Sequence, residues 1–345
     1  MSLLSSAAIC PTRRTRSRDA PPFEAQQPAL SIDNMLISVV IPTLNEAANI
    51  GRCIASIKSH WPSSLHLEIL VGDHGSTDST IEIAKAGGAR TISLPGGTVG
   101  ELRNRVVAEC RGSILIFLDA DCTVTVEWGE NLPMTLHDIG THPRQVTGSL
   151  CYAPDSDNLL NRYWFSRIDR DSSGYIGTGH MIVPAELFRE LKGFALGLRS
   201  GEDYDFCMRA KAAGASIVLR PDLRVVHHGY PLTVASFLRR EAWHGLGDFQ
   251  SLEAFKASRV ALASASLLAT QSAAFLAAPF RIDIAIVLQS CVIALVFGFS
   301  VLKFPNLGLW PRLVNAGIFY LYLIARGLSP FAARLRCAHQ RRSAS

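Results

Sequence analysis

Short apolar runs alternate with amphipathic stretches from about residue 36 onward. Four runs have the length of strands: 36–42, 67–72, 90–95 and 113–121. Within the last of them, Ile114–Leu118 has the continuous apolar character of a strand buried on both faces of a sheet. Three segments between them carry apolar residues at helical spacing: 46–59, 78–88 and 99–112. This alternation predicts repeated strand–helix units around a largely parallel sheet, and therefore an α/β fold.

Polar residues follow three of these strands at the point where each strand ends. The sequences are PTLNE at 42–46, GDHGSTD at 72–78 and DADC at 119–122. Any one of them is typical of a turn or a helix cap. In an open α/β sheet the carboxyl ends of the strands meet at one edge, where ligands bind. The three together therefore predict a ligand site at that edge.

A nucleotide-sugar site accounts for this set of residues. The diphosphate that leaves during sugar transfer must be neutralised, and a divalent metal can do this as a Lewis acid. Mg²⁺ or Mn²⁺ prefers oxygen ligands and takes one or two carboxylates in addition to the phosphates. We expect Asp121 to hold the metal, Asp119 to lie near the ribose and Asp73 to accept a hydrogen bond from the base.

Four stretches resemble the successive motifs of glycosyltransferase family 2: SVVIPTLNEAANIGRCIASI, EILVGDHGSTDST, ELRNRVVAECRGSILIFLDADC and GEDYDFCMRAKAAG. The resemblance covers about residues 37–247 and implies a GT-A fold, a metal-dependent nucleotide-sugar donor and inversion at the anomeric carbon. It implies metal contacts by Asp121 and His227. It also implies donor contacts by Pro42, Leu44, Glu46, Asp73, Arg103, Asp119 and Ala120. His74 stands where relatives often have a second Asp, and UDP is the favoured nucleotide.

The acceptor side is expected in residues 175–214. The segment 175–194 resembles the family's link between donor and acceptor sites, which assigns Gly179 and His180 to the acceptor side. The stretch 201–214 predicts a helix that begins at acidic residues, and such acids also favour a helix start by themselves. An inverting displacement needs a carboxylate near the acceptor hydroxyl. We interpret Asp203 as this base, with Glu202 and Asp205 as competing candidates. The family's Glu-Asp pair favours Asp203, and Glu202 is expected to orient the acceptor or the loop.

Two apolar segments near the C-terminus, 259–279 and 282–302, have about the ~20 residues that a membrane-spanning helix needs. A third, 313–331, contains Arg326, and an interfacial helix is its alternative. An even number of crossings returns the basic tail to the side of the catalytic domain. The predicted divisions are a disordered basic leader (1–34), a catalytic domain that folds without the helices (35–256), a membrane region of two to three helices (257–336) and a basic tail (337–345).

Composition narrows the function classes. The net charge is +5 without a continuous basic face, which argues against nucleic-acid binding. The eight cysteines form no C-x-x-C pair, which argues against a zinc site or a disulfide framework and favours a reducing compartment. The leader could also be a transit peptide. Arg239 and Arg240 are either a solvated helix face or cations near the pyrophosphate.

The sequence therefore predicts a multi-pass enzyme of the inner membrane with a cytoplasmic catalytic domain. It would move a sugar from a nucleotide-sugar to a lipid-linked or saccharide acceptor, in the synthesis of a cell-surface polysaccharide or glycolipid. Two alternatives stay open: a transferase that glycosylates polyprenyl phosphate, and a catalytically silent scaffold subunit of the same fold.

Overall fold

The computed structural model of the chain describes residues 35–154, 158–165, 174–304 and 307–331. Within these ranges, seven strands form one sheet in the order β3-β2-β1-β4-β8-β6-β9. Its first half is parallel, as predicted, and contains β1 (Leu36–Thr43), β2 (His66–Asp73), β3 (Arg90–Ser93) and β4 (Ile114–Leu118). In its second half, β8 (His180–Pro184) runs antiparallel to both β4 and β6 (Gln145–Gly148), and β9 (Ser216–Leu219) is parallel to β6. The sheet is therefore mixed.

Burial of the central strand β4 on both faces of the sheet explains why this strand is apolar at every position. Its five residues are all buried. Ile114, Ile116 and Leu118 belong to the hydrophobic core on one face of the sheet, and Leu115 and Phe117 to the core on the other face. Because side chains alternate along a strand, a strand covered on both sides needs apolar residues in both registers.

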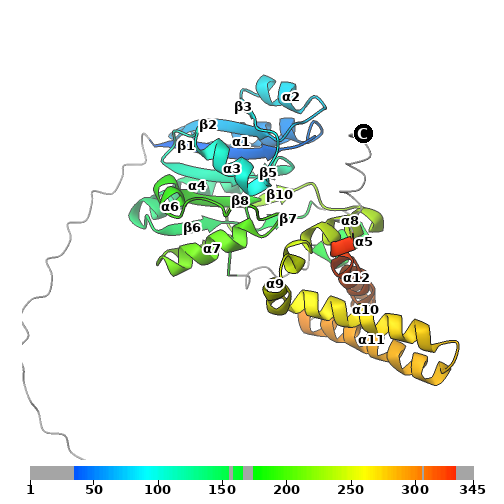
Figure 1. The fold of residues 1–345 in the computed structure, drawn as a ribbon. Helices are drawn as coiled ribbons and strands as arrows, with labels where there is room; N and C mark the ends of the chain where they lie inside the picture. The colour runs from blue at the N-terminus through cyan, green and yellow to red at the C-terminus, as the bar shows by residue number, and fades with distance from the viewer. Residues whose placement is uncertain (1–34, 155–157, 166–173, 305–306, 332–345) are drawn as a thin grey trace, which may run out of the picture.

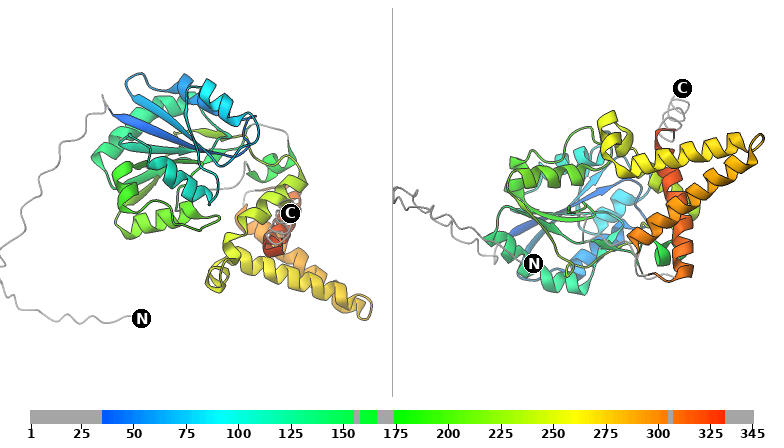
Figure 2. Two further views of the ribbon diagram at one scale, coloured as in Figure 1. Left: turned by 45° about the horizontal axis from the view of Figure 1, so that its top comes forward. Right: turned by 90° about the horizontal axis from the view of Figure 1, so that it is seen from below.

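Helices cover both faces of the sheet (Figures 1 and 2). One core includes residues of α1 (Ile50–His60), α2 (Thr80–Ala86) and α4 (Val126–Thr141). The opposite core includes residues of α3 (Val99–Val107), α6 (Ala185–Glu190) and α7 (Glu202–Ala212). The three helices predicted before β4 are present, although α1 begins four residues later than expected, after a turn in which Glu46 accepts hydrogen bonds from the backbone of Asn49 and Ile50.

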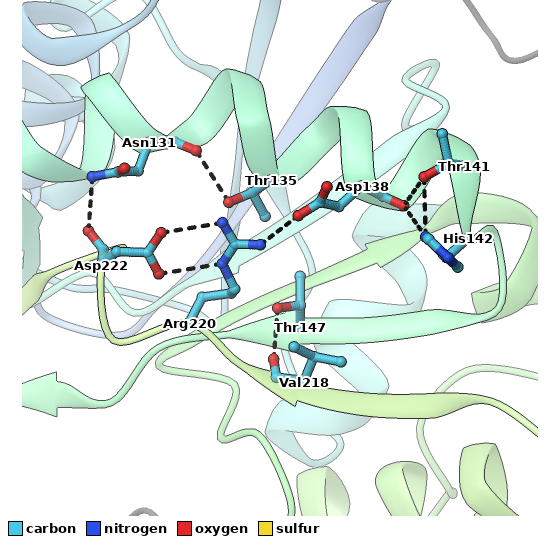
Figure 3. A network of polar contacts seen from close by, with 9 residues as sticks. All are labelled: Asn131, Thr135, Asp138, Thr141, His142, Thr147, Val218, Arg220 and Asp222. Carbon is cyan, nitrogen blue, oxygen red and sulfur yellow. Dashed lines mark hydrogen bonds and ion pairs between the residues drawn. The ribbon is translucent and has the colours of Figure 1, made fainter.

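A small second sheet carries the residues next to the site. It has the order β5-β10-β7 and contains β5 (Cys122–Val124), β7 (Cys151–Tyr152) and β10 (Val225–His227). The turn before β10 is held by Arg220, which donates to both carboxylate oxygens of Asp222 at 3.2 and 3.1 Å and to Asp138 of α4 at 2.6 Å (Figure 3). With this turn fixed, β10 pairs His227 with Cys122 and so brings His227 beside Asp121.

The C-terminal helices form a third core with part of the preceding domain. The chain continues through α5 (Leu159–Tyr163), α8 (Val234–His244), a 3-10 turn (Gly247–Phe249), α9 (Leu252–Ala257), α10 (Arg259–Ala277), α11 (Ile282–Lys303) and α12 (Leu309–Gly327). Figure 1 shows α10 and α11 as a hairpin that projects from the sheet domain. Trp164 and Phe237 pack in the third core with Leu267, Val296 and Phe319 of α10, α11 and α12. The expected division near residue 257 therefore crosses a continuous core.

Among the described residues, two helices are long and apolar enough to cross a membrane: α10 and α11. They coincide with the first two predicted segments. The third segment forms α12, which does not meet that test and packs against α8. The predicted leader (1–34) and basic tail (337–345) lie outside the described residues.

Candidate active site

The first cavity, which we call the donor cavity, lies at the carboxyl ends of β1 and β4 and has a volume of about 310 Å³. Several residues predicted to contact the donor or metal line it: Pro42, Leu44, Glu46, Asp119, Ala120, Asp121 and His227. His74, which the sequence singled out as a departure from the family motif, lines it as well, and the sequence prediction missed three lining residues, Thr43, Val99 and Leu102. Burial, together with the charges of Asp121 and Asp119, raises the pKa of Glu46. The three acids therefore share one electrostatic environment.

Asp73 is buried, with 1% of its surface exposed, and it does not line the donor cavity. Its carboxylate accepts hydrogen bonds from the backbone N–H groups of Gly75 and Ser76, each at 3.0 Å to Oδ2. Asp73 therefore shapes the loop after β2. The neighbouring His74 lines the cavity instead, and its buried Nε2 has no hydrogen-bond partner among the described residues.

Among the described residues, one cluster has the side chains to hold a metal ion. It consists of Asp121, Cys122 and His227, whose potential ligand atoms all lie within 4.8 Å of one another. His227 Nε2 is 3.4 Å from Asp121 Oδ1. Burial and the charge of Asp119 raise the pKa of Asp121 to about 6. A Cβ atom at Gly229 would lie 1.8 Å from Asp121 Oδ2, so only glycine lets the chain pass this carboxylate. The site is built around an anion that a cation would stabilise.

The thiol of Cys122 does not suit a hard metal. It is buried, it lies 4.0 Å from the sulfur of Cys151, and its contact with Cys151 together with burial raises its pKa. Mg²⁺ and Mn²⁺ prefer oxygen ligands, and Cys binds metal as a thiolate. Asp121 and His227 are therefore the residues of this cluster that fit such an ion.

Arg103 of α3 joins the two halves of the site. Its side chain is 3% exposed, and it donates to Asp119 Oδ1 at 2.7 Å and to Glu202 Oε1 at 2.8 Å. The sequence placed Arg103 at the donor, whereas the structure places it between Asp119 and the start of α7. Gly100 favours this approach, because a Cβ there would make tight contacts of 3.3 Å with Glu202 Cβ and Cγ. Glu202, which is 6% exposed, faces Arg103.

A larger cavity of about 940 Å³, which we call the acceptor cavity, opens beside α7. Asp203 lines it, and burial and the charge of Glu202 raise the pKa of Asp203 to about 6. Asp203 Oδ1 accepts a hydrogen bond from the N–H of Tyr204 at 2.8 Å. Asp205 also lines the cavity but pairs with Arg209 at 2.8 Å. Asp203 is therefore the carboxylate with the properties of a base near neutral pH.

Gly179 and His180 are adjacent in the sequence but lie in different environments. Gly179 lines the acceptor cavity. His180 is fully buried, accepts from the indole of Trp128 at 2.9 Å through Nε2, and has Nδ1 2.8 Å from the hydroxyl of Ser149. Burial lowers the pKa of His180 to about 3, so it stays neutral. His180 is a core residue behind the cavity wall.

A third cavity of about 470 Å³ lies beside the acceptor cavity, and we call it the junction chamber. Its walls come from the sheet domain and from α8, α11 and α12, and they include Arg240, Glu241, Lys303 and Arg326. The sequence prediction treated Arg326 only as an interruption of an apolar segment. Its place in a cavity wall depends on how α12 packs against α8, which no local pattern in the sequence indicates.

Comparison with known proteins identifies the family. A family model described as Glycosyl transferase family 2 matches residues 38–182, and one described as Glycosyl transferase family group 2 matches residues 150–324. Glycosyltransferase AglE of Haloferax volcanii is 29% identical over 226 residues, which cover 62% of this chain and 73% of that protein. The pre-mycofactocin glycosyltransferase of Mycobacterium tuberculosis is 24% identical over 225 residues, 61% of this chain and 46% of that protein. The chain therefore spans less than half of the mycobacterial relative.

A solved structure shows the same fold. The mannosyltransferase PcManGT from Pyrobaculum calidifontis, solved in complex with GDP-Man and Mn²⁺, superposes with a TM-score of 0.53 at 18% sequence identity. The match covers 85% of this chain and 86% of that one. The likeness in fold therefore extends over most of both chains.

Proposed function

Because this chain belongs to glycosyl transferase family 2 and has the GT-A fold, we propose that it moves a sugar from a nucleotide-sugar to an acceptor, with inversion at the anomeric carbon. The observation that carries the proposal is the position of Asp119, which lines both the donor cavity and the acceptor cavity. Val99 also lines both. The sugar to be transferred would therefore lie beside Asp119, with the nucleotide on one side and the acceptor on the other.

The cofactor of this proposal is Mg²⁺ or Mn²⁺, held by Asp121 and His227. Such an ion supplies positive charge to offset the diphosphate as it leaves. The raised pKa of Asp121 and the 3.4 Å approach of His227 support the assignment. Pro42, Leu44, Glu46 and Ala120 would enclose the nucleotide.

Asp203 is the proposed base. With a pKa of about 6, it is mostly ionised at neutral pH and can accept a proton from the acceptor hydroxyl. Arg103 and Glu202 act differently. Their ion pairs fix Asp119 relative to the start of α7, so they orient the two halves of the site and do not take part in proton transfer.

The acceptor is a lipid-linked or growing saccharide, and the enzyme is anchored in the inner membrane by α10 and α11 with its active site in the cytoplasm. Support comes from the two apolar helices and from an acceptor cavity whose lining includes Arg326 of α12 as well as the sheet domain. The position of three acids counts against the silent-scaffold alternative, because Asp119, Asp121 and Asp203 all line cavities, where they can meet ligands.

One observation supports the alternative in which polyprenyl phosphate is the direct acceptor. The junction chamber contains cations and shares His227 with the donor cavity, so a phosphate there would lie near the metal. A phosphate acceptor needs little base catalysis, and an active Asp203→Asn variant would therefore favour this alternative.

The experiment that tests the function begins with the donor. The purified full chain is heated with UDP-, GDP- or dTDP-sugars, each with and without Mn²⁺. A ligand that binds the native state raises the melting temperature by mass action. We expect a metal-dependent rise with a UDP-sugar, followed by transfer in the presence of acceptor. No rise with any donor would contradict the proposal. A rise with GDP-sugars alone would leave the enzyme class intact and assign His74 a part in base selection.

A further inference from the structure

We infer that Arg326 of α12 is a positioning residue of the reaction. It holds the segment 243–250 in place as a wall of the acceptor cavity and so connects the C-terminal helices to that cavity. This inference rests on the proposed function, since it concerns the acceptor half of the same site. Arg326 lines both the acceptor cavity and the junction chamber. It acts through the two acids that it contacts, Glu241 of α8 and Asp248 of the 3-10 turn.

The first argument is the geometry of the Arg326 guanidinium. Its Nε and Nη2 lie 3.3 and 3.2 Å from Oε2 of Glu241, and its Nη1 lies 3.3 Å from Oδ2 of Asp248. The ring of Tyr322, one turn earlier in α12, lies 5.1 Å from the guanidinium carbon. All three nitrogens therefore face a carboxylate of the protein. A planar guanidinium can join two acids in a fixed arrangement, and here it joins α8 to the turn that follows it.

The second argument is the burial of these charges. The side chain of Glu241 is 4% exposed and that of Arg326 is 17% exposed. Removing one partner of a buried pair leaves the other charge without compensation. Glu241 also pairs with Arg240 at 3.0 Å, so it retains one cation when Arg326 is lost. The loss of Arg326 should therefore loosen the wall of the cavity without unfolding the domain.

The third argument is that the turn has little support of its own. The 3-10 turn Gly247–Phe249 contains three residues, and none of them is buried. The N–H of Asp248 donates to the carbonyl of Gly245 at 3.1 Å, and the N–H of Phe249 donates to the carbonyl of Leu246 at 3.3 Å. Such short turns have poor hydrogen-bond geometry, and segments with few buried contacts open easily. Contacts from outside the turn, such as the ion pair with Arg326, must therefore hold it.

The fourth argument is the continuity of close contacts from α12 to α7. A Cβ at Gly245 would lie 2.1 Å from Ser329 Oγ and 3.2 Å from Arg326 Cδ, so the end of α8 packs directly against the end of α12. A Cβ at Gly247 would lie 2.7 Å from Oγ of Ser200, which lines the acceptor cavity. The contacts therefore continue from α12 through the turn to the loop before α7, the helix that carries the proposed base.

The test measures hydrogen exchange by mass spectrometry on the full chain in phosphatidylcholine nanodiscs. In Arg326→Gln, the hydrogen-bonded amides of residues 245–250 should exchange roughly tenfold faster than in wild type, because a hydrogen bond to a charged group contributes about this much. The amides of β4 should exchange at the wild-type rate, because the two sheet cores do not include Arg326. A general loss of stability would accelerate exchange in both places, so the comparison isolates the local effect.

Three further variants make the result specific. Arg326→Lys retains the charge, which can reach one of the two acids, and should restore part of the protection. Gly245→Ala leaves every charge in place but pushes the end of α8 away from Ser329, and it should also accelerate exchange in the turn. Arg281→Gln removes an arginine that pairs with Asp283 at 2.8 Å at the far end of the α10–α11 hairpin, and exchange in the turn should stay unchanged.

Kinetics test whether the wall serves the acceptor. Octyl β-D-glucoside is the probe acceptor, and the donor is the nucleotide-sugar that stabilises the wild type. In Arg326→Gln, the Michaelis constant for the glucoside should rise roughly tenfold, while that for the donor stays within about twofold. If Arg326 acts through Glu241, the double variant with Glu241→Gln should show less than the product of the two single effects.

Each contrary result overturns a defined part of the inference. Unchanged exchange in residues 245–250 of Arg326→Gln would show that Arg326 does not hold the wall. Faster exchange with unchanged Michaelis constants would show that the wall does not serve the acceptor. Effects that multiply in the double variant would show that Arg326 does not act through Glu241. A wild-type chain that no nucleotide-sugar stabilises would instead count against the proposed function, and the exchange results do not depend on the donor.

Discussion

The donor half and the acceptor half of the site are built in different ways. The donor cavity comes almost entirely from residues 42–121, at the ends of neighbouring parallel strands, and His227 is its distant member. The acceptor cavity combines a loop before β8, the start of α7, the segment 243–258 and Arg326 of α12. One half is fixed by the hydrogen-bond ladder of a single sheet. The other depends on how separate elements pack, so the two should respond differently to the same perturbation.

The hydrophobic cores divide along the same line. The two cores that enclose the sheet contain no residue beyond Val225 among those that are buried. The third core requires α10, α11 and α12 to cover Trp164 and Phe237. The helices beyond residue 257 are therefore part of the support for the acceptor half. The donor half is supported mainly by the two sheet cores, and His227, whose ring lies 4.8 Å from that of Tyr230, is its contact with the third core.

The largest effect is expected from ending the chain after residue 256. The truncated protein loses Arg326 and uncovers Trp164 and Phe237, so transfer should be abolished. Its two sheet cores remain whole, so nucleotide and Mn²⁺ should still raise its melting temperature in mild detergent. A truncated protein that transfers at the full rate would show that the acceptor half needs no helices. If it shows no nucleotide-induced shift, the donor half depends on them as well.

Next in size is Asp121→Asn, which acts on the donor half. The neutral amide of asparagine lacks the negative charge with which the carboxylate binds a divalent cation. The Mn²⁺-dependent part of donor binding should therefore disappear, and transfer should fall to background. Titration calorimetry with Mn²⁺ measures this directly. Cys122→Ser serves as the matched control and should keep Mn²⁺ affinity within a few-fold. Unchanged Mn²⁺ affinity in Asp121→Asn would refute the metal assignment.

Asp203→Asn acts on the acceptor half alone. A positioned base contributes roughly 10²–10⁴-fold, so transfer should fall by about that factor while donor affinity stays within a few-fold. The base must be ionised, and its pKa is raised to about 6. The profile is measured at saturating Mn²⁺, which keeps Asp121 ionised, because the pKa of that residue is also raised to about 6. The wild-type rate should then increase as pH rises through about 6 and level off, and the profile of the variant should lack that limb.

The two outcomes that would break this assignment are distinct. Near-normal transfer in Asp203→Asn directs attention to Asp205 or to a phosphate acceptor. A parallel fall in transfer and donor affinity would mean that Asp203 belongs to the donor half, and the division of the site drawn above would be wrong.

The smallest effect is expected from Arg103→Lys, which tests the connection between the halves. Lysine keeps the charge but cannot donate from two fixed nitrogens to Asp119 and Glu202 at once. Losing one charge-assisted hydrogen bond of about 1.5–3 kcal/mol should lower kcat roughly ten- to hundredfold, with the pH limb near 6 retained. A Michaelis constant that changes for the donor while kcat stays constant would show that Arg103 serves the donor only.

The sequence alone determined the four strands of the parallel half of the sheet, the helices before β4 and the acids at the strand ends. These features follow from local rules: a strand buried on both faces needs a continuous apolar run, and the acids that interrupt such a run must lie at its exposed end. Asp119 and Asp121 were predictable for that reason. The two apolar helices were predictable as well, because their length and composition are properties of one segment.

Other features depended on which side a residue faces or on contacts between distant segments, and only the tertiary structure decided them. Gly179 and His180 are neighbours at the start of a strand, where successive residues face opposite sides. Gly179 therefore faces the cavity, and His180 faces the core beside Trp128. Arg103 meets acids 16 and 99 residues away, and Arg326 meets Glu241 across 85 residues. No local pattern encodes such pairs, because they form only when separate helices and strands pack together and bring their buried charged groups into contact.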